Sequence, residues 1–225
     1  PALASRRVLL IHSGGDSRRV PWANTFGKAF IPLPLLADPD HALPAVFDHL
    51  VAVTSGFVDA LAGGGMVALS GDMLLLFDPA RLRLPRDAAV VVTTPVPLDL
   101  ASRHGVIVGD EDGRVRRLLQ KASPAELEAA GALIEGGAAL LDTGVWAFTG
   151  ATFAELVGVA VEQPGAYERL LESGDSCSLY EELGGAMVES SQPVIARTDW
   201  GRRLVERLGA RPLEHRRADE LMFLH

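Results

Sequence analysis

Short runs that are apolar at almost every position recur along the chain, with segments of other patterns between them. Such a run is typical of a strand whose sheet is covered on both faces. The runs that predict strands are Arg7–His12, Met66–Leu69, Ala88–Val96 and Leu140–Phe148. We therefore expect a buried sheet, whose first strand opens directly into a glycine-rich turn.

Helical spacing of apolar residues marks several of the segments between these runs. Apolar residues in Pro44–Leu61 recur at helical intervals, and Gly63–Gly65 would end that helix. Ser123 and Glu126 form a capping box with proline at the first helical position, so a helix begins there and runs to about Leu133. Two further helices are predicted over Thr152–Val161 and Leu179–Val188.

A hairpin is predicted in the middle of the chain. Gly105–Gly109 and Val115–Gln120 are extended segments joined by a turn that contains Asp112-Gly113, a strong hairpin signal. The segment Glu220–His225, which contains the last apolar residues of the chain, predicts one more strand. Antiparallel strands then lie beside parallel ones, which predicts a mixed α/β sandwich without internal repeats.

Length and composition favour one large domain over residues 1–225, because 48% of the residues are hydrophobic. The most apolar stretch, Met66–Phe77, is interrupted by Ser70-Gly71-Asp72 and is too short to span a membrane. The N-terminus has no signal-peptide pattern, and the single cysteine, Cys177, cannot form an internal disulfide. We expect a soluble, cytoplasmic protein.

The charge balance limits the partners that the protein can bind. A net charge of −8 argues against nucleic acid or an anionic membrane as a partner, since both require a basic face. An anionic substrate would have to meet a local cluster of cations. Among the 21 basic residues only Lys28 and Lys121 are lysines, and both fall in motifs described below.

The segment after the first predicted strand holds such a cluster. Small residues let backbone N–H groups approach phosphate oxygens, and Arg18, Arg19 and Lys28 follow in the same loop. The alternative is a tight strand exit followed by solvated arginines. A P-loop is excluded because Ala29 stands where a hydroxyl residue should follow the lysine, and the dinucleotide-binding glycine pattern is absent.

At this point the sequence HSGGDSRRVPWANTFGKAFIPLP, residues 12–34, resembles the signature loop of the L-fucokinase/GDP-fucose pyrophosphorylase family. That loop is a variant of the one found in sugar nucleotidyltransferases, with Ser17 where the wider superfamily usually has glycine. The resemblance implies catalytic roles for Arg19, on the leaving pyrophosphate, and Lys28, on the phosphates that undergo transfer. It implies nucleotide binding by Ser13, Gly14, Gly15, Asp16, Ser17 and Arg18.

Other motifs extend the resemblance along the chain. Asp72 follows a predicted strand and matches a family Mg²⁺ ligand, although a Gly-Asp turn is the alternative. Gln120-Lys121 is similar to the Glu-Lys-Pro element, whose lysine faces the sugar phosphate, but it lacks the glutamate and the proline. Two segments resemble sugar-binding elements and imply substrate contacts by Gly105, Asp142 and Gly144.

For Trp146 and two further segments, a structural role is expected rather than a catalytic one. Trp146 is expected in the core. Asp199-Trp200-Gly201 is expected to form an exposed turn, and Ser178–Leu183 resembles a family helix with a structural role.

The resemblance implies a three-layer α/β/α sandwich with a mixed, mainly parallel sheet, as in GT-A/Rossmann-like nucleotidyltransferases. It implies formation of GDP-L-fucose and pyrophosphate from GTP and L-fucose 1-phosphate, with Mg²⁺ as cofactor. No residue can be tied to guanine or to fucose, so base and sugar come from the resemblance alone. The alternatives are a pyrophosphorylase for another sugar 1-phosphate and a nucleotide-sugar-binding or regulatory domain without turnover.

The resemblance to this family also implies substrates and further domains in the same polypeptide. We expect its partners to be a nucleoside triphosphate and a sugar 1-phosphate, with covalent fusion to a C-terminal β-helix and a GHMP-type sugar kinase domain.

Overall fold

The computed structural model describes residues 3–12, 27–33, 43–57, 61–71, 73–78, 81–175, 178–188, 196–209, 211–218 and 222–224. The strands are β1 (Arg7–His12), β2 (Gly65–Ser70), β3 (Leu74–Leu76), β4 (Ala89–Pro97), β5 (Gly105–Gly109), β6 (Val115–Gln120), β7 (Ala138–Thr149), β8 (Leu213–Arg217) and β9 (Met222–Leu224). The α-helices are α1 (Val46–Ser55), α2 (Leu98–Ala101), α3 (Pro124–Ala129), α4 (Gly150–Glu162), α5 (Pro164–Ser173) and α6 (Asp199–Leu208). The described residues also form two short 3₁₀ turns, η2 (Lys28–Phe30) and η4 (Glu135–Gly137), and a π-helical turn, η5 (Leu179–Gly184).

The central sheet has the order β1-β2-β7-β4-β8, and β5 pairs with both β7 and β6. The pairs β1–β2 and β4–β8 are parallel, and the other pairs are antiparallel. Strands β1, β2, β4, β5 and β8 therefore run in one direction and β6 and β7 in the other. The prediction of a mixed, mainly parallel sheet is confirmed in that five of the seven strands run in one direction, although only two of the six strand pairs are parallel.

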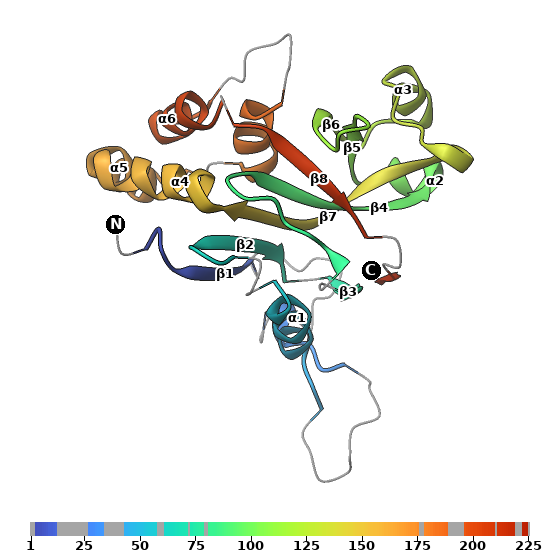
Figure 1. Cartoon of the computed structure of the whole chain (residues 1–225), viewed down its shortest axis with the longest axis horizontal. Coiled ribbons are helices and arrows are strands. Elements are labelled where there is room, and N and C mark those ends of the chain that lie inside the picture. Colours follow the sequence, from blue (N-terminus) through green and yellow to red (C-terminus); the bar gives the residue numbers. More distant parts are fainter. Residues whose placement is uncertain are drawn as a thin grey trace.

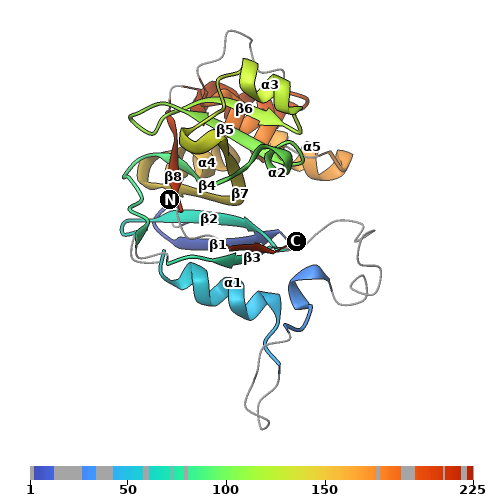
Figure 2. The same cartoon turned by 90° about the vertical axis from the view of Figure 1, so that its right-hand side faces the viewer.

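Helices cover the sheet on both faces, which confirms the three layers (Figures 1 and 2). Along β4, Val90 and Val92 pack with Leu50 of α1, whereas Val91 packs on the opposite face with Phe153 of α4. This alternation is the pleat of a strand that is buried on both sides. A third, smaller core lies between the β5–β6 hairpin, α2 and α3.

Strand β7 is the element that joins the two parts of the sheet. One of its edges pairs with β4 over most of its length, and its other edge is divided between two strands. There, Val145–Thr149 pairs with β2, and Leu140 and Leu141 pair with β5. Between these two pairings, residues 142–144 have no strand partner on that edge among the residues that the structure describes.

The first strand is where predicted, but its predicted burial is wrong. β1 pairs with β2 at one end of the sheet order, and Leu9 and Leu10 are 42% and 49% exposed. An apolar run indicates a strand, but its place in the sheet depends on pairings with distant residues.

Several predicted helices are shorter than their patterns suggested. The helix expected over Pro44–Leu61 ends at Ser55, and Gly56 is its C-cap. The capping box is confirmed, because the backbone N–H of Ser123 donates to the Glu126 carboxylate at 2.7 Å. That helix ends at Ala129 rather than near Leu133, since Gly131 adopts a left-handed φ of +72°.

The prediction of an exposed turn at Asp199-Trp200-Gly201 is also wrong. These residues form the first turn of α6, where Trp200 is buried and Thr198 caps the helix by accepting the N–H of Gly201 at 2.9 Å. Helix α5 and strand β8 were not predicted from the sequence. Within the described ranges no helix is long and apolar enough to cross a membrane.

Candidate functional site

The carboxyl ends of β1 and β2 lie side by side. His12 and Ser70 are register partners, and the N–H of Gly71 donates to the carbonyl of His12 at 2.8 Å. The segment that begins at Ser13 and the segment that contains Asp72 therefore start from adjacent points on one sheet edge. In open α/β sheets, ligands bind outside the carboxyl ends of such strands.

Most of the predicted nucleotide loop lies outside the described residues. This holds for Ser13 to Arg19 and for Asp72, so their roles stay predictions. Lys28 is described by its backbone alone, at the start of η2. Among the parts of the chain with described placement, no three His, Cys, Asp or Glu side chains gather as a metal site would require.

The unpaired stretch of β7 carries the predicted sugar-binding residues. At this point one residue of β4, Val92, faces three of β7, which is a bulge. The hydroxyl of Thr143 donates to the carbonyl of Val92 at 2.8 Å. Gly144 has a φ of +71°, which favours glycine, and a Cβ there would lie 3.7 Å from that of Ser70. The bulge thus brings β7 next to the end of β2.

Asp142, at the start of this bulge, is a partly buried carboxylate. It accepts the backbone N–H of Gly144 at 2.7 Å and the indole N–H of Trp146 at 3.3 Å. Desolvation raises the pKa of Asp142 to about 6, although both hydrogen bonds act in the opposite direction. Trp146 is buried as predicted, but its indole N–H also contacts the site.

The open end of the β5–β6 hairpin approaches Asp142 from the other side. Gly105 pairs with Gln120, and a Cβ on Gly105 would lie 3.4 Å from that of Asp142. Lys121 follows at once, with an exposed side chain and a left-handed φ of +49°. Its backbone N–H donates to the carbonyl of His104 at 2.9 Å, so the turn is fixed while the ammonium group remains in solvent.

Tyr180 is a neighbour of this site that the sequence reading did not assign to it. Its hydroxyl lies 3.2 Å from the position of a Cβ on Gly105, and its ring meets Trp146 edge-on with the ring centroids 6.2 Å apart. No local pattern marks this residue, because its partners lie far away along the chain.

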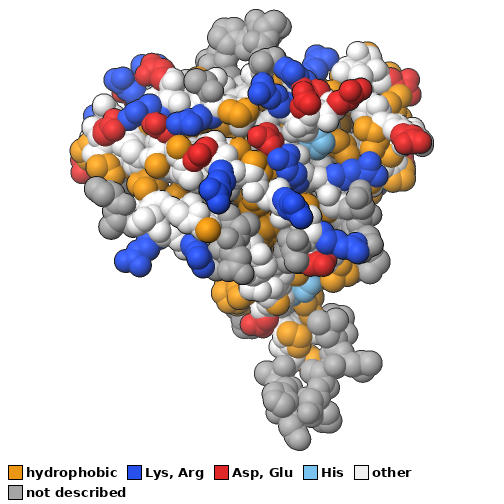
Figure 3. All heavy atoms as spheres, viewed as in Figure 1, with side chains coloured by type: hydrophobic (Ala, Val, Ile, Leu, Met, Phe, Trp, Pro, Cys, Tyr) orange, Lys and Arg blue, Asp and Glu red, His pale blue; other side chains and the backbone are white. Residues whose placement is uncertain are grey.

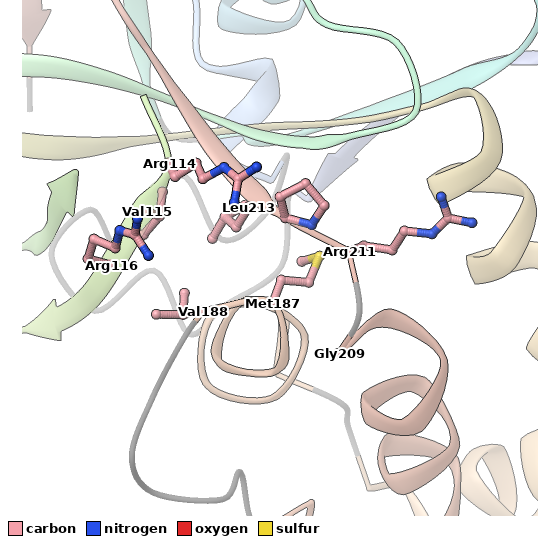
Figure 4. A pocket seen from close by; sticks show the side chains of 9 residues that line it. Arg114, Val115, Arg116, Met187, Val188, Gly209, Arg211 and Leu213 are labelled. Carbon is pink, nitrogen blue, oxygen red and sulfur yellow. The ribbon is translucent and has the colours of Figure 1, made fainter. Parts of the chain in front are cut away.

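A separate pocket of about 260 Å³ lies between β6, β8 and the end of α6 (Figure 4). Three arginines line it, but Arg116 pairs with Asp110 at 2.7 Å and Arg211 with Glu155 at 3.6 Å. Figure 3 likewise shows arginines among acidic side chains on that face. The pocket lies near Val115, at the opposite end of the hairpin from Gly105, and does not belong to the candidate site.

Comparison with known proteins places this arrangement in a family. A sequence model described as the fucose pyrophosphorylase domain matches residues 1–208. The chain is 38% identical, over 99% of its length and 22% of the relative, to the bifunctional fucokinase/GDP-fucose pyrophosphorylase of Arabidopsis thaliana. It is 30% identical, over 50% of its length and 19% of the relative, to the fucose-1-phosphate guanylyltransferase of Mus musculus.

The chain thus spans about a fifth of the length of these curated relatives. The family match covers the nucleotide loop, the β5–β6 hairpin and the bulge of β7 alike. The chain belongs to the fucose pyrophosphorylase domain family.

Proposed function

We propose that this domain transfers a nucleotidyl group from a nucleoside triphosphate to a sugar 1-phosphate, and that it makes GDP-L-fucose from GTP and L-fucose 1-phosphate. The family and the names of the two relatives support the reaction class and these substrates. GTP and fucose rest on the relatives' names, since no described residue faces an identified base or sugar.

One structural observation carries the proposal. The bulge at Asp142–Gly144 lies between the ends of β1 and β2, where the nucleotide loop begins, and the hairpin end that holds Gly105 and Lys121. Residues matched to nucleotide binding and residues matched to sugar binding thus flank a single gap in the sheet. Two substrates that must react with each other need such adjacent sites.

The reaction requires alignment and charge neutralisation more than proton transfer. A phosphate oxygen of the sugar 1-phosphate attacks the α-phosphorus of the triphosphate. The bond from that phosphorus to the bridging oxygen breaks, and pyrophosphate leaves with its electron pair. Because the nucleophile is already an anion, no general base is required.

The roles proposed for the chain follow from these charges. Lys121 would meet the sugar phosphate, Arg19 the leaving pyrophosphate, and Lys28 the phosphates in transfer. Asp142 would accept hydrogen bonds from sugar hydroxyls, and Gly144 would orient it through the backbone N–H that it donates to this carboxylate. Asp72 would hold Mg²⁺ together with phosphate oxygens, and the ion would neutralise phosphate charge when bound.

A pyrophosphate-release assay tests the proposal. The chain is mixed with Mg²⁺, each of the four nucleoside triphosphates and several hexose 1-phosphates. Release that is fastest with GTP and L-fucose 1-phosphate supports the full proposal, and release with another pair corrects the substrates. Lys28→Ala should lower the rate by roughly 10²–10³. Full activity of this variant contradicts the role of the lysine, and a wild-type chain inactive with every pair contradicts the proposed reaction.

A further inference from the structure

Residues 178–188, the segment that contains Tyr180, pack between α6 and the β5–β6 hairpin. The segment begins with the π-helical turn η5, and Leu183 and Met187 are buried in the same core as Trp146. π-Helical turns are rare and frequently lie at functional sites.

Glu182 anchors this segment to the start of α6. Its side chain is 2% exposed, and its carboxylate accepts two backbone N–H groups, from Ser178 and from Arg197, both at 2.8 Å. A Cβ on Gly201 of α6 would lie 2.5 Å from this carboxylate. Buried carboxylates are stable only when they are hydrogen-bonded in this way, so the anchor is fixed in one geometry.

Tyr180 contacts the hairpin near the end that carries Lys121. Its hydroxyl lies 3.3 Å from the carbonyl oxygen of Val106 and 3.1 Å from that of Leu119. Val106 and Leu119 are register partners, one on each strand of the hairpin. Burial and the nearby Asp142 carboxylate raise the pKa of Tyr180, so its hydroxyl stays protonated and can donate its one proton to either carbonyl.

The same side chain also packs beside Asp142 and Trp146 of β7. The position of a Cβ on Gly105 would be 3.2 Å from the Tyr180 ring and 3.4 Å from the Cβ of Asp142. Because a larger residue at 105 would have to displace one of them, Tyr180, Gly105 and Asp142 are fitted to one another. The Trp146 ring, which donates to Asp142, supports Tyr180 edge-on.

We infer that Tyr180, anchored through Glu182, is a positioning residue that sets the distance between Lys121 on the hairpin and Asp142 on β7, and thereby the affinity for the sugar 1-phosphate. The inference rests on the proposed function. Lys121 lies two residues after Leu119, which Tyr180 contacts. A shift of the hairpin end therefore moves the Lys121 ammonium group relative to β7. The nucleotide loop starts from β1, and β1 reaches β7 only through β2, which pairs with Val145–Thr149 rather than with the Leu140–Leu141 stretch that holds the hairpin.

Tyr180→Phe tests the inference because it removes the hydroxyl and keeps the ring. We expect the KM for the sugar 1-phosphate to rise by about three- to tenfold, the effect of losing one hydrogen bond. The KM for the nucleoside triphosphate should stay within about twofold, and kcat should change less than the sugar KM. Ser173→Ala also removes one hydroxyl that donates to a backbone carbonyl, on α5, and should leave all three constants unchanged.

Hydrogen exchange supplies a readout that does not need activity. Peptides that cover residues 104–121 should exchange faster in Tyr180→Phe than in wild type, whereas peptides from β2 should not. An unchanged sugar KM overturns the inference, and so does an equal rise of both KM values, which would indicate general loosening. A wild type without activity contradicts the proposed function, and the inference falls with it. An active wild type with an unaffected Tyr180→Phe contradicts the inference alone.

Discussion

The indole N–H of Trp146 donates to the carboxylate of Asp142, four residues earlier on the same strand. The buried Trp146 side chain thus orients the carboxylate of Asp142 in the candidate site. The hydrogen bond offsets only part of the desolvation, which raises the pKa of Asp142 to about 6. Folding therefore favours the protonated form of this carboxyl group.

This raised pKa gives the stability a defined pH dependence. The contribution of Asp142 is fully present below its unfolded pKa of 3.8 and is lost as the pH rises through about 6. Asp142→Asn cannot ionise, so its free energy of unfolding relative to wild type should rise by about 1–2 kcal/mol between pH 4 and pH 7, after discounting for partial exposure. Urea denaturation at several pH values measures this difference. Parallel curves for the two proteins would contradict the assignment.

Lys121 offers a test of the sugar side of the site. Lys121→Met keeps most of the side chain and removes the charge, so the KM for the sugar 1-phosphate should rise by about 10- to 100-fold, as expected for a charge-assisted hydrogen bond. The matched control is Arg117→Met, which removes a charge from an exposed position of β6. Initial rates over both substrate concentrations separate the two variants. Equal effects would indicate that only the overall charge of the hairpin matters.

Gly63 and Gly64, just before β2, allow a matched comparison of how an added methyl group changes the stability of the fold. Gly63 and Gly64 have φ values of +101° and +108°, but a Cβ on Gly63 meets nothing within 4 Å. A Cβ on Gly64 would lie 2.1 Å from the carbonyl oxygen of Ala4, which belongs to the backbone and cannot rotate away. Gly64→Ala should lower the free energy of unfolding by at least about 2 kcal/mol more than Gly63→Ala. Similar melting temperatures for the two variants would disprove this reading.

Two helical glycines should respond to alanine with opposite signs. In Gly201→Ala the new methyl group meets the fixed Glu182 carboxylate at 2.5 Å, so the protein should lose about 1–3 kcal/mol despite the better helix propensity of alanine. A Cβ on Gly158 of α4 would have Glu162 as its nearest neighbour, at 3.8 Å. Gly158→Ala should therefore raise the free energy of unfolding by up to about 1 kcal/mol. Thermal unfolding of both variants decides between them, and a stabilised Gly201→Ala would refute the anchor.

Local patterns predicted those parts of the fold that local interactions determine. The hairpin bounds are correct because Asp112-Gly113 fixes the turn, and the capping box forms within four residues. Helix α6 was missed although Trp200, Leu204 and Leu208 repeat at four-residue intervals and are all buried, because Gly201 in the first turn suggested a loop. The exposure of β1 depends on sheet order, which no local pattern contains.

The candidate site likewise has residues that local motifs marked and a residue that only distant contacts place there. The structure brings Gly105, Asp142 and Gly144 together and places Lys121 beside Gly105, whereas the sugar contacts that their motif matches implied stay predictions. The contribution of Tyr180 could not be predicted, since its hydroxyl meets carbonyl groups 74 and 61 residues away in the sequence.

The divided edge of β7 has a consequence for how such a domain can change. The strands next to the nucleotide loop and the hairpin that carries Lys121 attach to different stretches of that edge, Val145–Thr149 and Leu140–Leu141. Under the proposed function, substitutions in the hairpin should therefore alter the sugar selectivity without disturbing the β2–β7 register beside the predicted nucleotide loop. Because the bulge separates the two stretches, the same proposal implies that selectivity for the sugar and selectivity for the nucleotide can change independently on a common strand.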